Sequence, residues 1–193
     1  MARGRSRITL TLFLLASCLV PTSASAALRL DDLAGHLSIG YAKLLVSNAP
    51  GGSIALATGV DYPLTRTLRA GIDVGYDLLG SRTVQRGSLF ASVDYSAFEA
   101  TAFLHWIPAR GPVGRVSIGP ALVNAHGDLS VTGGGASFSD LAVHETAGGV
   151  AAAITLMPLK PAPVRLGFEL SGRRAFMPGE DWQLISARVT VHY

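Results

Sequence analysis

Polar and apolar residues alternate along most of this chain with the two-residue period of β-strands. Successive side chains of a strand point to opposite faces, so this alternation separates an apolar face from a polar one. It recurs in residues 37–42, 54–62, 68–77, 98–106, 115–122, 145–156, 164–173 and 185–193, which predicts eight strands. No stretch with a helical period competes after residue 26. In residues 68–77 the pattern is cleanest: Leu68, Ala70, Ile72, Val74 and Tyr76 alternate with Arg69, Gly71, Asp73, Gly75 and Asp77.

The predicted strands are separated by two kinds of connection. Short segments that contain Pro follow three of them, at residues 62–65, 107–112 and 157–161. Longer stretches rich in Gly, Ser or Asn occupy residues 47–53, 80–88, 125–140 and 174–181. The alternation fails between residues 89 and 96, where a bulge or a loop that reaches up to the next strand is expected. Tight turns that alternate with longer loops are typical of an antiparallel up-and-down barrel.

Alternation alone does not tell which face of a barrel is wet, and a soluble barrel with an apolar centre fits it equally well. The composition of the polar face favours the opposite orientation. It is rich in Gly and Ala and carries charges of both signs, which suits a narrow interior where small residues separate paired large ones. His105 and His192 fall on the same face. We therefore expect a polar network in the lumen, made of Arg69, Asp73, Asp77, Glu99, Arg115, Glu145, Arg165, Glu169, Arg173 and Arg188.

The first 26 residues have the three parts of a secretory signal. Arg3, Arg5 and Arg7 form a basic region, residues 8–20 an apolar stretch, and residues 24–26 a small-residue cleavage site. The apolar stretch is shorter than the ~20 residues of a transmembrane helix. We expect cleavage after residue 26, which leaves one domain of residues 27–193. An alternative is that Cys18 becomes a lipidated N-terminus, because residues 15–18 resemble a lipobox.

Removal of this leader changes the meaning of the composition. The chain has 16 basic and 13 acidic residues, and the three charged residues of the leader are all Arg, so the remainder is balanced. A nucleic-acid-binding surface, which needs concentrated positive charge, has no support. Cys18 is the single cysteine, so the predicted mature domain has no disulfide. The whole chain is 49% hydrophobic and only 15% charged, and apolar residues this common, without a helical span, suit short alternating segments.

Aromatic residues lie near the ends of the predicted strands. Tyr62 and Trp106 precede the first two Pro turns, Tyr193 ends the last strand on the same side, and Trp182 lies near the opposite loops. Aromatic rings are enriched at both membrane interfaces, so we expect Tyr62, Trp106, Trp182 and Tyr193 to mark the boundaries of a bilayer.

These features together resemble the small eight-stranded outer-membrane β-barrel proteins of the OmpA-barrel, OmpX and OmpW kind. The resemblance rests on the leader, the alternating strands, the Pro-based turns and the ending Ala187, Arg188, Val189, Thr190, Val191, His192 and Tyr193. It implies an all-β, eight-stranded antiparallel up-and-down transmembrane barrel. In that family, a terminal aromatic on an alternating strand looks like the signal read by the barrel-assembly machinery. Tyr at the end, where Phe is commoner, and the Gly/Ala run of residues 147–153 leave the subfamily open.

Motifs for metals, nucleotides and cofactors are absent from the sequence, and Gly133 with its two following glycines reads as a loop tip. Some outer-membrane barrels are lipid A deacylases with a Ser, a His and an acid on the outer face. The candidates for such a triad here are His144 and Glu145 with Ser139. His36 and Ser38 have no acid nearby in sequence. An interfacial His without a catalytic role is the simpler interpretation of His144, because triads are recognised by geometry.

The sequence therefore predicts a non-enzymatic integral outer-membrane barrel that presents surface loops and contributes to envelope structure, adhesion or minor permeation. No cofactor is expected. Its partners would be outer-membrane lipid or lipopolysaccharide and the barrel-assembly machinery, and we expect a monomer. Two alternatives stay open: an outer-membrane lipid A-modifying hydrolase, and a soluble periplasmic β-barrel that binds an apolar ligand.

Overall fold

The computed structural model describes residues 32–46, 49, 51–109, 111–133, 136–157, 164–179 and 181–193. The expected leader, with Cys18, lies outside these residues, as does the core of the third Pro turn. The described residues form eight strands: β1 (Ala34–Leu44), β2 (Ser53–Pro63), β3 (Leu68–Arg86), β4 (Leu89–Trp106), β5 (Val113–Gly133), β6 (Ala136–Leu156), β7 (Arg165–Ala175) and β8 (Trp182–His192).

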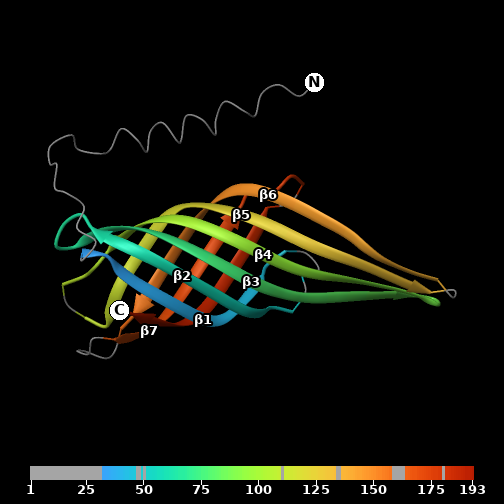
Figure 1. Cartoon of the computed structure of the whole chain (residues 1–193), viewed down its shortest axis with the longest axis horizontal. Coiled ribbons are helices and arrows are strands. Elements are labelled where there is room, and N and C mark those ends of the chain that lie inside the picture. The colour runs from blue at the N-terminus through green and yellow to red at the C-terminus, as the bar shows by residue number, and fades with distance from the viewer. Residues whose placement is uncertain are drawn as a thin grey trace, which may run out of the picture. The chain divides into compact units, whose positions relative to one another are not determined.

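The eight strands form one closed ring in which each strand pairs with its neighbours in sequence, and the predicted all-β up-and-down barrel is confirmed. All pairs are antiparallel (Figure 1). β1 and β8 close the ring over nine residue pairs, from His36 opposite His192 to Leu44 opposite Leu184. Beyond these pairs, Gly35 and Tyr193 exchange two backbone hydrogen bonds of 3.0 Å, which extend the seam by one more residue. No described helix is long and apolar enough to cross a membrane.

The two ends of the barrel differ in their connections. The β2–β3, β4–β5 and β6–β7 connections lie at one end, which we call the turn end, together with the start of β1 and the end of β8 (Figure 1). At the β2–β3 turn, the backbone N–H groups of Leu64 and Thr65 both donate to the carbonyl of Leu68, and the Thr65 hydroxyl accepts from Leu68 N–H. The opposite end, the loop end, carries the other four connections.

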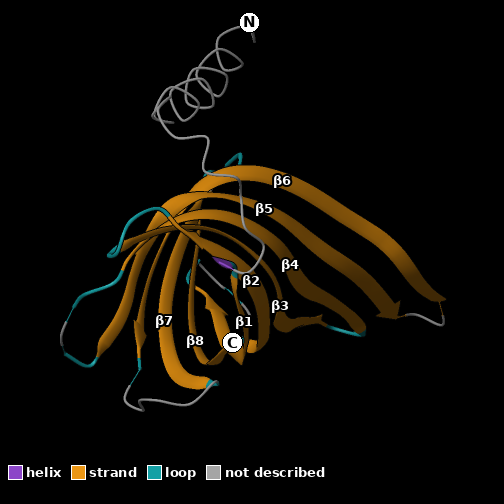
Figure 2. Cartoon of the chain, turned by 60° about the vertical axis from the view of Figure 1, so that its left-hand side comes forward, coloured by secondary structure: helices purple, strands orange, loops and turns teal. Residues whose placement is uncertain are grey.

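Four strands continue well past the ring at the loop end. β3 pairs with β2 only as far as Asp77, and β6 pairs with β7 only from Gly149 onward. β3 with β4 and β5 with β6 nevertheless stay paired to Arg86 and to Ala136. Figures 1 and 2 show the result, a four-stranded sheet that projects from the barrel, which we call the blade. The sequence-based prediction of loops at 80–88 and 125–140 is therefore wrong over most of both segments.

A β-bulge marks the base of the blade. The irregularity expected in residues 89–96 is not in β4, whose residues there pair without a break. The register shifts instead on β3, between Leu78 and Gly80. Gly80 has a φ of 85°, a conformation that glycine adopts without steric cost. The extra residue, Leu79, is fully buried.

Within the ring, the two faces of each strand differ sharply in exposure. Ile72 is 60% exposed, whereas its neighbour Asp73 is 7% exposed, and the same contrast repeats from strand to strand. Large apolar side chains point away from the barrel, and charged and hydroxyl side chains point into it. The ring thus has an apolar exterior and an interior in which the charged residues are buried, the reverse of a soluble barrel.

Candidate functional site

The lumen near the turn end holds a set of ion pairs built on Arg115. Its Nη2 donates to Oε2 of Glu169 at 3.1 Å, and its Nη1 lies 3.9 Å from Oδ1 of Asp61. Asp61 also pairs with Arg69, and the Thr155 hydroxyl donates to the same Glu169 oxygen at 3.2 Å. These residues come from five strands, so the pairs brace the barrel across its centre. Charge-assisted bonds of this kind offset the cost of burying each ion.

A second set of ion pairs lies nearer the loop end. Arg188 donates from Nη2 to Oδ1 of Asp77 at 3.0 Å and lies 3.8 Å from Oε2 of Glu99. Nε of Arg173 approaches the same Glu99 oxygen at 2.8 Å. The Ser171 hydroxyl hydrogen-bonds the Ser186 hydroxyl at 2.6 Å and accepts from Nη1 of Arg173. Glu99 is 1% exposed and Arg188 1%, so this layer is closed to solvent.

Above the second layer the lumen is apolar. A cluster of buried residues fills it: Ala42, Leu44, Ala55, Leu79, Ala97, Val123, Ala125, Ala147, Ala175, Met177 and Leu184. Tyr95 and Trp182 pack against this cluster, with ring centroids 6.5 Å apart in an edge-on arrangement. This apolar layer was not predicted from the sequence, because more than half of its members are alanines, at positions that read as neutral. The lumen of the ring is thus filled by side chains along its length.

Eight of the ten residues expected in the lumen network take part in its ion pairs. Glu145 and Arg165 do not. Glu145 follows the inward side of β6 but lies above the ring, where it lines a small cavity of about 270 Å³ with Trp182. Arg165 is exposed at the turn end, opposite His192 in the β7–β8 pairing. Strand parity assigned both to the inward face, but parity carries no information about their height along the barrel.

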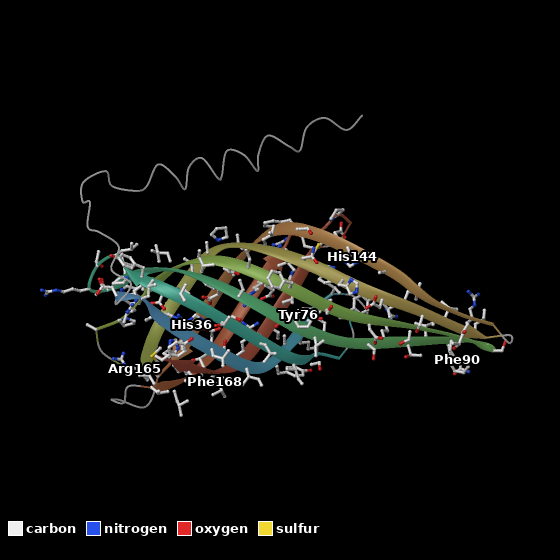
Figure 3. The ribbon with its side chains drawn as sticks, viewed as in Figure 1. His36, Tyr76, Phe90, His144, Arg165 and Phe168 are labelled. Atoms are coloured by element: carbon white, nitrogen blue, oxygen red, sulfur yellow. The ribbon has the colours of Figure 1, made fainter. Side chains whose placement is uncertain are left out.

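His36 joins the interior through contacts that its sequence neighbours did not indicate. Its Nε2 lies 3.3 Å from Oδ2 of Asp73 on β3, and its ring stacks on His192 at 5.3 Å. Figure 3 shows His36 among the side chains of the ring. His105, also buried, shares a 2.7 Å hydrogen bond with the Ser117 hydroxyl. His36 and Ser38 are 1% and 2% exposed and belong to the packed lumen.

The four aromatic residues expected at membrane boundaries fall into two groups. Tyr62, Trp106 and Tyr193 lie at the turn end, and the last two are 52% and 66% exposed. The ring of Tyr193 covers Gly35 on the neighbouring strand, where a side chain would collide with it. Trp182 is different. It shares the inward parity of Leu184 and packs on the apolar cluster inside the barrel. Trp182 therefore does not occupy the interfacial position expected from the sequence.

The outward face has an apolar band with polar edges. On five strands the outward apolar positions give way, toward the loop end, to a first polar residue that is exposed or half-buried. These residues are Lys43, Asn124, Thr146, Arg174 and Gln183, and two of them hydrogen-bond to each other. Asn124 donates to Thr146 at 2.7 Å, and Arg174 makes two hydrogen bonds to Asp181. Apolar rows between an aromatic edge and a polar edge are what a lipid-facing barrel wall requires.

His144 stands just above this band, in contact with a second histidine. Its Nδ1 lies 2.9 Å from Nδ1 of His126, the residue opposite it on β5. Nε2 of His126 in turn lies 2.9 Å from Oδ2 of Asp128. Both nitrogens of His126 are thus occupied, and Figure 3 places His144 at the base of the blade.

His144 and Glu145 are neighbours on β6, and their side chains point to opposite faces of the strand. The triad expected from His144, Glu145 and Ser139 therefore does not form. Ser139 belongs to β6, and its side chain is not among those described. In the described ranges no cluster of three or more His, Cys, Asp or Glu residues is arranged to hold a metal ion.

Comparisons with known proteins agree with this geometry at the level of the fold. No family model matches the chain, and no curated protein matches it in sequence. Among solved structures, Neisserial surface protein A superposes with a TM-score of 0.56 at 14% identity, covering 83% of this chain and 96% of that one. Ail, the attachment invasion locus protein of Yersinia pestis, solved with the heparin analogue sucrose octasulfate, superposes with a TM-score of 0.51 at 13% identity, covering 84% and 99%. The chain therefore has the fold of the small eight-stranded outer-membrane β-barrels.

Proposed function

We propose that the protein is an integral outer-membrane barrel that holds the blade at the cell surface as a binding element. The observation that carries the proposal is the inversion of the barrel wall, in which Ile72 is exposed and Asp73 is buried. In water such a wall would leave a continuous apolar belt in contact with solvent, which monomeric soluble proteins avoid. Hydrocarbon tails are the environment in which this belt is stable.

The filled lumen supports a structural role in place of a pore. Two layers of ion pairs and one apolar layer occupy the interior, and an eight-stranded ring is only wide enough for its own side chains. Minor permeation, one of the roles expected from the sequence, has little support from this packing. We expect purified protein to give no stepwise conductance in planar bilayers.

The blade supports surface binding by its form and its edges. In the described pairings, β3 beyond Asp77 and β6 before Gly149 each have a partner on one side only. Such edges offer rows of backbone donors and acceptors to an extended peptide. The apolar side chains of Val84, Leu89 and Phe90 are exposed near the tip, which Figure 3 marks at Phe90. A protein partner that adds a strand to the blade is the kind of ligand this shape fits.

The hydrolase alternative has one observation in its favour, the linked side chains of Asp128, His126 and His144 on the outward face. A triad needs a nucleophile hydrogen-bonded to its base, and here the ring nitrogens of His126 go to Asp128 and His144. We propose a non-enzymatic role. Unchanged acylation of lipid A when the protein is overproduced is the expected result, and loss of an acyl chain that depends on His144 would reverse the assignment.

In this proposed role, the protein's partners are the outer-membrane lipids, including lipopolysaccharide, and the barrel-assembly machinery. The apolar band supports the first. The second rests on β8, which alternates along its length and is followed by Tyr193 at the turn end. In chain order, the pairing of β8 with β1 is the last seam to close. A machinery that catalyses barrel closure would therefore bind β8.

Two measurements test membrane insertion. Folded protein should run at a different position from boiled protein on a cold detergent gel, and it should stay with the membrane pellet after a carbonate wash. Release of the protein by osmotic shock, with identical migration before and after boiling, would support the soluble periplasmic alternative.

Cysteine labelling tests which end of the barrel faces outward. Ser88 lies at the tip of the blade and Arg66 in the β2–β3 turn, and both are exposed. In intact cells, a membrane-impermeant maleimide should label the Ser88→Cys variant and leave Arg66→Cys unlabelled until the outer membrane is opened. Equal labelling of both, or labelling of Arg66→Cys alone, would overturn the surface assignment.

A further inference from the structure

The outward wall of the barrel carries a groove that crosses five strands. It has a volume of about 560 Å³ and is lined almost entirely by apolar atoms. Its lower side is a row of paired residues, Val116, Ile154, Leu170, Ala187 and Tyr41, each opposite the next on the adjoining strand. Its upper side is the next outward row, in which Ala152, Gly172, Ile185 and Lys43 follow one another in the same way.

The groove exists because small residues interrupt two rows of large ones. Ala152, Gly172 and Ala187 leave the middle of the path low, while Ile154, Leu170 and Ile185 stand beside it. A Cβ added at Gly172 would meet no atom within 4 Å, so the space above this residue is open.

The direction of the groove follows from the strand register. Val116 is near the turn end of β5, whereas Lys43 is next to the last residue of β1 at the loop end. The path therefore climbs the wall from the turn end to the loop end as it crosses from β5 to β1. Four steps between neighbouring strands give it a length of roughly 19 Å. A narrow, apolar, inclined path of this length has the shape of an extended acyl chain.

Lys43 supplies the one charge on this path. It is exposed at the polar edge of the band, and none of the ion pairs found among the described residues includes it. A lysine at headgroup level attracts an anionic headgroup, and its ammonium can donate to phosphate oxygens. The apolar path ends where that phosphate would lie.

We propose that this groove is a specific site for a phosphorylated lipid of the outer leaflet, with one acyl chain along the path and a phosphate on Lys43. The proposal rests on the insertion of the barrel in the outer membrane, as proposed above. An unfilled recess in a lipid-facing wall forfeits dispersion contacts, so a chain that fits it is held better than one on a smooth wall. The phosphate contact then selects anionic lipid from the surrounding lipids.

The test compares lipid retention among variants by native mass spectrometry. Purified protein, loaded with bis-phosphorylated lipid A in mild detergent, should keep one lipid A per barrel. Gly172→Phe fills the groove and should reduce retention to background. Gly148→Phe is the matched control, since Gly148 also has open space above it but does not line the groove. Equal retention by the two variants would overturn the site.

The charge is tested separately. Lys43→Met should lower lipid A retention by about tenfold, the effect of one lost charge-assisted hydrogen bond, and Lys43→Arg should restore it. Neither change should alter retention of dephosphorylated lipid A. Millimolar inorganic phosphate should not displace the bound lipid A, because the acyl chain in the groove holds the lipid and free phosphate competes only for Lys43. Displacement of lipid A by phosphate would contradict the acyl-chain assignment.

Heat-shifted migration of every variant on a cold gel separates the two proposals. If Gly172→Phe keeps the shift and loses the lipid, the groove is the site. A wild-type protein with no shift would remove the membrane premise itself. If cross-linking instead finds a wild-type dimer that Gly172→Phe abolishes, with no lipid retained by either, the occupant is a second copy and the lipid proposal fails.

Discussion

Arg188 and Asp77 form a buried ion pair across the lumen, 3.0 Å between Nη2 and Oδ1, although 111 positions separate them in the chain. Their side chains are 1% and 0% exposed. Since Arg188 also approaches Glu99, its removal leaves two carboxylates without their shared cation. The pair therefore ties β8, one side of the closing seam, to the third strand of the ring.

Arg188→Met should destabilise the barrel by about 3–5 kcal/mol, because breaking one side of a buried pair leaves an uncompensated charge. Urea unfolding in lipid vesicles, followed by the fluorescence of Trp106 and Trp182, measures the change. The double variant with Asp77→Leu should recover part of the loss. A double variant whose loss of stability equals the sum of the two single losses would mean that the pair is not coupled.

Leu44→Ala should destabilise the barrel much more than Leu45→Ala. Leu44 is 1% exposed within the apolar layer of the lumen, whereas its neighbour Leu45 is 44% exposed. Truncation of a buried Leu costs about 2–5 kcal/mol through the lost burial and the cavity left behind. The same urea titration compares the two variants. Similar midpoints would show that the apolar layer adds little to stability.

An arginine on the wall should be costly only within the membrane. Val74 lies in the outward apolar band, and Val84 lies in the blade, exposed to a similar degree. Val74→Arg should cost about 2–4 kcal/mol, the cost of a cation near the bilayer midplane, and Val84→Arg close to nothing. Folding yield into vesicles and urea midpoints report the difference. A soluble barrel would tolerate both variants, because in water both side chains are simply wet.

Gly40→Ala should weaken the β1–β8 seam. A Cβ at Gly40 would run into the backbone of Ala187 and Arg188 on β8, which cannot move aside without opening the pairing. Overpacking of this kind costs about 1–3 kcal/mol. Gly148→Ala, with open space above it, is the control. The temperature at which the heat-shifted gel band is lost should fall for the first variant and stay near wild type for the second.

The ring was predictable from sequence because a membrane divides each strand into a lipid side and a lumen side. Where Ile72 and Asp73 alternate, the physical environments alternate too, and the period of two is visible. Above Leu78 both faces of the blade meet water, so no contrast between positions is selected and residues 80–88 read as a loop. The pattern weakens where the closed ring ends and the blade begins.

The sequence predicted which residues face the lumen better than it predicted which of them contact each other. Parity gave the inward side of Arg188 and Asp77 but not their pairing, because the distance along the chain carries no record of which strands lie across the lumen. Trp182 was misassigned for a related reason. An aromatic near a strand end suits either an interface or the cap of an interior, and only the parity of Leu184 and Ser186, both buried, distinguishes them.

The bulge at Leu79 has a consequence for how this protein can change over time. It separates a part whose register is fixed by ring closure from a part whose strands end freely. Residues added or lost in matched pairs at the outer tip would lengthen or shorten its reach without disturbing the sealed cylinder below. Natural selection could thus reshape the blade while the ring continues to fold as before.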